Sequence, residues 1–148
     1  MNEVLRAAVI GSSSSGGWGH NIDELFIGVP GLRTVAVADD TDVGVGDAVT
    51  RHRLTQTARG FLNWQKMLAD VKPDVVAICS RNIQQHAEMA IASAEAGVRG
   101  IFMEKPFVKS VPEADAVVSA CEKSNTKLNL ALVNRYCPTI TAVWELIA

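Results

Sequence analysis

Apolar residues follow two alternating patterns along this chain, and together they predict a parallel α/β fold. Continuous apolar runs, which parallel strands covered on both faces require, lie at residues 6–10, 35–38, 75–79 and 100–103. Weaker strands are expected at 55–58, as a polar edge strand, and at 127–132. Helical spacing of apolar residues predicts helices near 22–26, 41–53, 64–71, 85–96, 110–121 and from 138 onward. This alternation predicts a doubly wound parallel sheet of about six strands.

The stretch between the first strand and the first helical pattern, residues 11–19, consists almost entirely of glycine and serine. With so little side chain, its backbone N–H groups can approach a phosphate closely, as in a dinucleotide site. The fingerprint G-x-G-x-x-G fits at Gly11 and Gly16, but Ser13 stands where the second glycine belongs. A glycine–serine loop without a ligand is the alternative. The candidate contacts here are Gly11, Ser12, Ser13, Gly16, Gly17 and Trp18.

An acidic residue, Asp39, follows the second strand, 23 residues beyond Gly16. A carboxylate at about that distance binds the ribose hydroxyls of the adenosine half in a dinucleotide fold. The same charge repels the additional phosphate of NADP, so NAD is the expected cofactor and NADP the less favoured one. Alternatively, Asp39 opens a turn or caps the next helix, and the two roles can coexist.

Polar residues also follow the strands at 75–79 and 100–103, where Ser80-Arg81-Asn82 and Glu104-Lys105-Pro106 stand. Opposite charges at the end of a buried strand are costly unless they pair or face a cleft. Ligands of a doubly wound sheet bind beyond the carboxyl ends of its strands, so these clusters and the glycine-rich loop are expected on one rim. His86 lies in the first turn of the next helix, where a solvent-facing or backbone-bonded role and a functional contact both stay open.

Composition narrows the function without identifying it. The 148 residues are 48% apolar and 20% charged, as in ordinary globular domains, and the net charge is −2. We expect no nucleic-acid partner, no membrane span and no secretory signal, because neither a Lys/Arg stripe nor the apolar runs of such segments occur. Cys79, Cys121 and Cys137 are widely spaced, so we expect no metal site, buried thiols at the first two and a reduced, cytoplasmic setting.

The Glu-Lys-Pro triplet at 104–106 belongs to a wider set of motifs. An Ala-Gly pair and a strand precede it at 96–103, and the chain also carries Lys72-Pro-Asp-Val-Val76, an early helical His86 and Asn134-Arg-Tyr136. In these motifs, over essentially all its length, the chain resembles the N-terminal half of the glucose–fructose oxidoreductase/inositol dehydrogenase (Gfo/Idh/MocA) family. It departs from the family at Ser13 and at residues 80–82, where Thr-Pro-Asn is more usual.

The resemblance implies a Rossmann domain that binds NAD or NADP and serves the oxidation or reduction of a sugar, polyol or related hydroxyl compound. It implies that Lys105, held by Glu104 and Pro106, lies beside the nicotinamide and the substrate as the main catalytic residue. An ammonium group there can stabilise a developing alkoxide, whereas the alternative is a structural Glu104–Lys105 pair. Positions matching the nicotinamide side of the cofactor are Ser80, Asn82 and His86.

The family's second, mainly antiparallel α+β substrate domain is absent from these 148 residues. We therefore expect a dinucleotide-binding domain over residues 1–137 and the start of a connecting helix over 138–148. The apolar face around Trp144 needs cover from a further domain, a second copy or a partner chain, and the chain alone should bind dinucleotide without turnover. A regulatory coenzyme A-binding module is the alternative suggested by Gly11-Ser12-Ser13; Asp39 and the Glu-Lys-Pro triplet argue against it.

Overall fold

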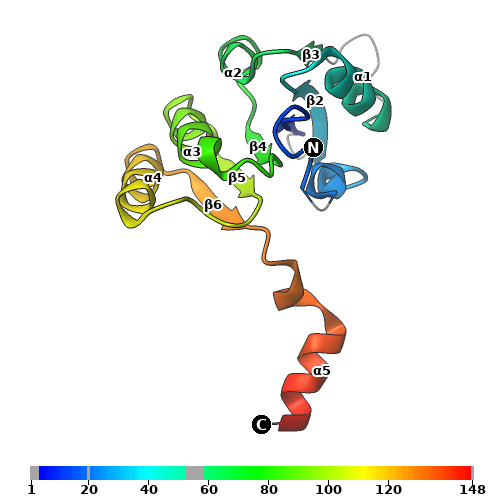
Figure 1. Ribbon diagram of the computed structural model, residues 1–148, viewed down its shortest axis with the longest axis vertical. Coiled ribbons are helices and arrows are strands. Elements are labelled where there is room, and N and C mark those ends of the chain that lie inside the picture. The colour runs from blue at the N-terminus through cyan, green and yellow to red at the C-terminus, as the bar shows by residue number, and fades with distance from the viewer. Residues whose placement is uncertain (1–3, 20, 53–58, 148) are drawn as a thin grey trace.

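Six parallel strands form one sheet at the centre of the computed structural model, which describes residues 4–19, 21–52 and 59–147. The strands lie in the order β3-β2-β1-β4-β5-β6 (Figure 1). This order confirms the predicted Rossmann-type doubly wound fold, and its direction of winding reverses between β1 and β4. The bounds are β1 Leu5–Ile10, β2 Leu32–Ala38, β3 Arg59–Phe61, β4 Val75–Ile78, β5 Gly100–Met103 and β6 Lys127–Leu130.

The edge strand β3 is formed by residues 59–61. The polar segment expected to form it, residues 55–58, lies outside the described residues. In the other strands the apolar runs and the observed bounds agree to within a few residues. They agree because a strand covered on both faces needs apolar side chains at every position.

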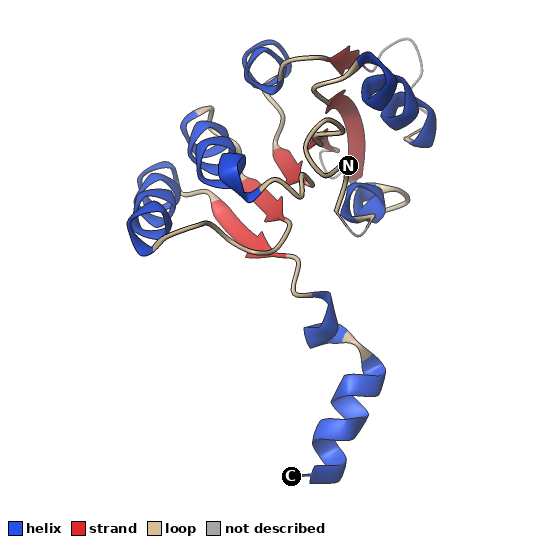
Figure 2. Ribbon diagram, viewed as in Figure 1, coloured by secondary structure: helices blue, strands red, loops and turns tan. Residues whose placement is uncertain are grey.

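Helices cover the two faces of the sheet unequally (Figure 2). The larger apolar cluster joins the sheet to the helices α2, α3 and α4, and the smaller one joins it to α1 and to the short 3₁₀ helix η1. Adjacent residues of β1 enter different clusters, since Val9 belongs to the smaller and Ile10 to the larger. The bounds are η1 Ile22–Phe26, α1 Asp42–Arg51, α2 Trp64–Val71, η2 Ile83–Gln85, α3 His86–Glu95 and α4 Val111–Ser124.

The helix expected after the glycine-rich loop is only the five-residue η1. It begins after Asn21, whose backbone is left-handed (φ 56°), and Gly28 and Gly31, with φ of 77° and 78°, turn the chain into β2 soon after it. So short a segment cannot offset the unfavourable nucleation of an α-helix. Ile22 is buried, whereas Leu25 of the predicted apolar face is 47% exposed. The glycine-rich loop therefore does not lead into an α-helical N-terminus.

The remaining helices follow their sequence signals closely. Thr41 caps α1 by accepting from Gly44 N, and Ser110 caps α4 by accepting from Glu113 N. On α4, Val117 and Cys121 are buried as predicted, but Val118 is 49% exposed. Position 118 lies at the margin of the apolar stripe, where helical periodicity alone cannot decide burial.

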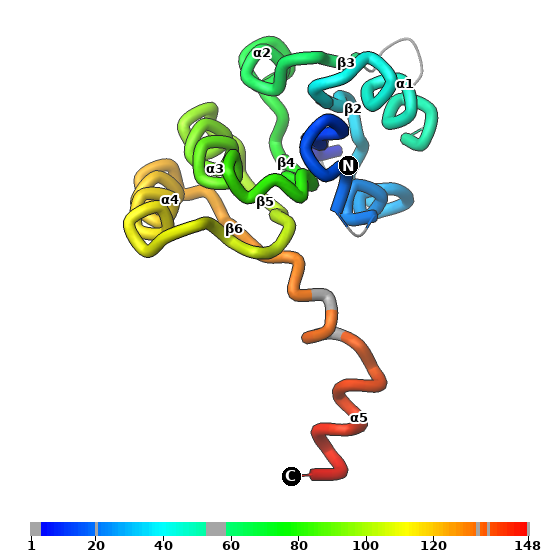
Figure 3. Tube along the Cα trace, viewed as in Figure 1, coloured from blue at the N-terminus to red at the C-terminus, as the bar shows by residue number. Residues whose placement is uncertain are grey.

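The last helix, α5 (Pro138–Ile147), extends away from the sheet after the 3₁₀ helix η3 (Val133–Tyr136) (Figure 3). Its apolar side chains are exposed, Trp144 by 67% and Leu146 by 85%. Among the described residues, every helix is too short or too polar to cross a membrane.

Candidate functional site

The glycine-rich loop closes over the point where the strand order reverses. Trp18 forms an antiparallel bridge with Ser80, immediately beyond β4. Gly19 N donates to Cys79 O at 2.6 Å, and Arg81 N donates to Gly17 O at 3.2 Å. These contacts bring the end of β1 and the end of β4 together, so two of the predicted polar clusters share one rim.

Glycine is required at several points of this loop. Gly16 and Gly17 have φ of 95° and 73°, and Gly17 N donates to Ser12 O at 2.9 Å, which closes a tight turn. Gly11 has an ordinary backbone, but a Cβ there would overlap the indole of Trp18. Trp18 thus packs directly on the first glycine of the fingerprint.

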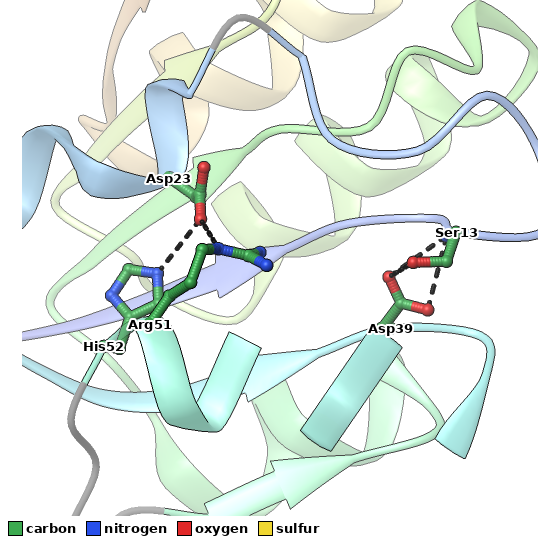
Figure 4. Close-up of polar contacts among 5 residues, drawn as sticks. All are labelled: Ser13, Asp23, Asp39, Arg51 and His52. Carbon is green, nitrogen blue, oxygen red and sulfur yellow. Dashed lines mark hydrogen bonds and ion pairs between the residues drawn. The ribbon is translucent and has the colours of Figure 1, made fainter. Parts of the chain in front are cut away.

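Asp39 holds in place the loop residue that replaces the second glycine of the fingerprint. Its carboxylate accepts from Ser13 N at 3.1 Å and from Ser13 Oγ at 2.9 Å (Figure 4). It also accepts from Thr41 N and Thr41 Oγ1, both at 3.0 Å, and is only 2% exposed. Gly44 makes this possible, because a Cβ there would overlap Asp39 and Ser13. Asp39 therefore lies at the predicted strand end and also organises the turn that follows, as the alternative interpretation expected.

Asp40, which the sequence analysis did not single out, holds the loop from the other side. It accepts from Ser12 Oγ at 2.6 Å, from Ser14 N at 3.0 Å and from Ser14 Oγ at 2.5 Å. Burial raises the pKa of Asp40, but the hydrogen bonds from Ser12 and Ser14 outweigh it and lower the pKa to about 2. The sequence does contain the run of serines and a second acid. That they pair becomes apparent only from the parallel alignment of β1 and β2.

A cavity of about 210 Å³ opens beside these two carboxylates. Asp39 and Asp40 line one side of it, residues 62–65 at the start of α2 another, and Gln85 and Met89 a third. Trp64 was predicted as core, and it does pack on the larger apolar cluster, yet it also lines this cavity. The segment 62–65 follows β3, so it too stands at a strand's carboxyl end.

The Glu-Lys-Pro triplet lies at the end of β5 on the same rim. Glu104 N donates to Ile78 O at 2.8 Å, and the Glu104 carboxylate, 1% exposed, accepts from Lys105 N at 2.9 Å. A Cβ at Gly19 would overlap that carboxylate, so the exit of the glycine-rich loop lies against Glu104. The Lys105 side chain is exposed at the rim.

His86 is buried and bonded to backbone, on the nicotinamide side that the resemblance implied. Its Nδ1 lies 2.8 Å from the carbonyl O of Pro106 and 3.1 Å from that of Phe107. Its Nε2 lies 2.8 Å from the carbonyl O of Ser80, and the residue is 0% exposed. Nearby, Asn82 Oδ1 accepts from Gln84 N at 3.1 Å and caps η2.

A buried charge cluster supports the loop from behind. Asp23 Oδ2 lies 3.2 Å from Arg51 Nε and 3.3 Å from His52 Nε2 (Figure 4). Burial raises the pKa of Asp23, but the hydrogen bonds from His52 and Arg51 outweigh it, so the pKa is lowered. The Arg51 guanidinium stacks over Trp18, 5.0 Å from the ring centroid. The cluster links η1 to the end of α1, and no motif in the sequence predicted it.

Comparison with known proteins supports the same fold. A family model described as an oxidoreductase family with an NAD-binding Rossmann fold (GFO_IDH_MocA) matches residues 5–132. Among solved structures, a myo-inositol 2-dehydrogenase from Lactobacillus plantarum matches 98% of this chain with a TM-score of 0.79 and 20% identity. The WlbA dehydrogenase from Chromobacterium violaceum, solved with NADH and UDP-GlcNAcA, matches 96% with a TM-score of 0.78 and 23% identity. The chain spans only 41% and 39% of those two proteins.

Proposed function

The chain belongs to the Gfo/Idh/MocA oxidoreductase family, and we propose that it forms the NAD-binding half of an enzyme acting on a sugar, polyol or related hydroxyl compound. One observation carries the proposal. The glycine-rich loop, the two acids after β2 and the Glu-Lys-Pro triplet meet on one rim, within the range that the family model matches.

The residues present fit a dinucleotide. The cavity beside Asp39 and Asp40 suits the adenosine half, with the two carboxylates accepting from ribose hydroxyls. The turn at Gly16 and Gly17 offers the pyrophosphate close backbone approach. NAD is the favoured cofactor, because the 2′-phosphate of NADP would meet two negative charges. NAD held there would supply the hydride chemistry of the reaction.

The role proposed for Lys105 follows from its place on the rim. Its ammonium group hydrogen-bonds the reacting hydroxyl of the substrate and stabilises negative charge that develops on that oxygen. Glu104 holds the backbone of Lys105 through the 2.9 Å bond to its N–H. The ammonium is exposed in this chain, so water screens its charge and weakens the effect.

Turnover, we propose, needs a further domain or a partner chain that covers this rim and binds the substrate. The two solved relatives are more than twice as long as this chain, and the apolar side chains of α5 offer a surface for such a domain or for a second copy. All three cysteines are free, with Cys79 and Cys121 buried, in keeping with a reducing, cytoplasmic setting.

Calorimetric titration of the chain with NADH, NADPH and coenzyme A tests the proposal. NADH should bind at least about tenfold more tightly than NADPH, since a charged hydrogen-bond partner is worth ~1.5–3 kcal/mol. Asp39→Ala should narrow that gap, whereas Asp42→Ala, an exposed acid in the first turn of α1, should leave it unchanged. Equal or tighter binding of NADPH would contradict the cofactor assignment, and binding of coenzyme A alone would favour a regulatory module.

The proposed need for a further domain has its own test. The purified chain is incubated with NAD and a panel of sugars and polyols while the absorbance of NADH is followed. We expect binding without turnover, because the proximity and electrostatic effects that dominate catalysis require a closed site. Sustained turnover by the monomer would show that the rim is complete without a further domain.

A further inference from the structure

The imidazole of His86 bridges two segments that are well separated in the sequence. One ring edge faces the carbonyl groups of Pro106 and Phe107, just beyond Lys105, and the opposite edge faces the carbonyl group of Ser80, just beyond β4. The partners lie 20, 21 and 6 residues from His86 along the chain. A rigid ring between them sets how far apart the two segments lie.

All partners of the ring in these contacts are hydrogen-bond acceptors. A carbonyl oxygen only accepts hydrogen bonds, so a ring nitrogen bonds to it only when that nitrogen carries a proton. The imidazolium form bonds on both edges at once, whereas the neutral ring bonds on one edge. Because the residue is 0% exposed, a bound ligand cannot reach the ring, and His86 acts only through the backbone that it holds.

We propose that His86 is a positioning residue that holds the Lys105 segment against the end of β4, and so shapes the nicotinamide side of the site without touching the cofactor. The inference rests on the proposed placement of the nicotinamide beside Lys105. Asp39 and Asp40, which hold the adenosine side, are bonded to residues 12–14 and 41. Loss of the histidine should therefore affect the two ends of the dinucleotide unequally.

The first test compares NADH with ADP-ribose, which lacks the nicotinamide. His86→Phe keeps a flat ring but removes both ring nitrogens, leaving three carbonyl groups without this partner. We expect the affinity for NADH to fall about tenfold or more, while that for ADP-ribose falls less than about threefold. Equal losses for both ligands, or no loss for either, would overturn the proposal. Val117→Ala, a core truncation in α4 away from the rim, is the control and should leave the ratio of the affinities unchanged.

The second test needs no cofactor. Amide hydrogen exchange in the ligand-free chain should become about tenfold faster or more in residues 104–108 of His86→Phe, with α4 unchanged. A uniform increase across the chain would mean general destabilisation and would overturn the positioning role. If the Phe variant does not fold, His86→Gln, whose amide retains two donors, is measured in the same way and should show the same local pattern at smaller amplitude.

Failure of the proposed function would look different. If the wild-type chain binds NADH no better than ADP-ribose, the nicotinamide gains nothing from the Lys105 segment and its placement there is wrong. Hydrogen exchange in the His86 variants then still decides whether the histidine holds that segment.

Discussion

The two sides of the rim achieve their geometry by different means. On the proposed adenosine side, acids bond the side chains and amides of a serine-rich loop, through Asp39 with Ser13 and Asp40 with Ser14. On the proposed nicotinamide side, one imidazole bonds backbone carbonyl groups and one carboxylate bonds a backbone amide. The first arrangement concentrates negative charge, which we propose favours NAD over NADP. The second fixes the backbone and leaves the Lys105 side chain exposed, where we propose that it acts on the substrate.

The two sides also differ in the elements that support them. The loop after β1 leads only into the five-residue η1 and is supported by Trp18, Arg51 and the buried Asp23. The segment after β4 leads through η2 into the ten-residue α3, whose first residue is His86. The adenosine side thus depends on side-chain packing and ion pairs, and the nicotinamide side depends on a regular helix. Three sets of variants separate these contributions.

The largest effect should come from Lys105→Met. In an assembly that supports turnover, this change should lower the rate by ~10²-fold or more, because it removes the charge that stabilises the developing alkoxide. NADH affinity, measured by calorimetry, should stay nearly unchanged. Lys109→Met is the matched control, since Lys109 follows Lys105 in the same loop but its ammonium is engaged with Glu113 at 3.0 Å. Near-normal turnover in the Lys105 variant would assign that lysine to structure.

Two glycines of α1 provide the next comparison. Gly44→Ala would press a methyl group onto Asp39 and Ser13, so we expect a loss of ~1–3 kcal/mol in the free energy of unfolding and about tenfold weaker NADH binding. Gly46→Ala meets nothing within 4 Å and should stabilise the helix by ~0.5–1 kcal/mol with unchanged affinity. Urea unfolding and calorimetry measure both. The same response in the two variants would show that the Asp39–Ser13 contact has no special role.

The smallest effect concerns acid stability. The pKa of Asp40 falls from 3.8 to about 2 on folding, so its contribution to stability is present above pH 4 and is lost as the pH falls through about 2. Asp40 is exposed and screened by solvent, which limits the contribution to about 1 kcal/mol. Urea unfolding of Asp40→Asn should show a shallower loss of stability between pH 4 and 2 than the wild type. An identical slope in both proteins would mean that the bonds from Ser12 and Ser14 do not survive in solution.

Much of the fold follows from local pattern. The apolar runs at β1, β2, β4 and β5 predicted strands because their burial on both faces appears directly in the sequence. The helical pattern at 22–26 was misleading, because its spacing is correct but its length cannot sustain an α-helix. The edge strand predicted at 55–58 lies outside the described residues, and β3 itself has little burial to impose a pattern, since only its residue 61 is partly buried.

The sequence by itself determined which residues stand at the carboxyl ends of the strands, because apolar runs end where polar residues begin and parallel strands end on one rim. Tertiary structure alone decided their partners. Asp39 meets Ser13 across 26 positions, His86 meets Pro106 across 20 and Asp23 meets His52 across 29. The physical reason is that these pairings depend on strand order and register. Both are set by the packing of the whole sheet, and the local alternation of apolar and polar residues does not encode them.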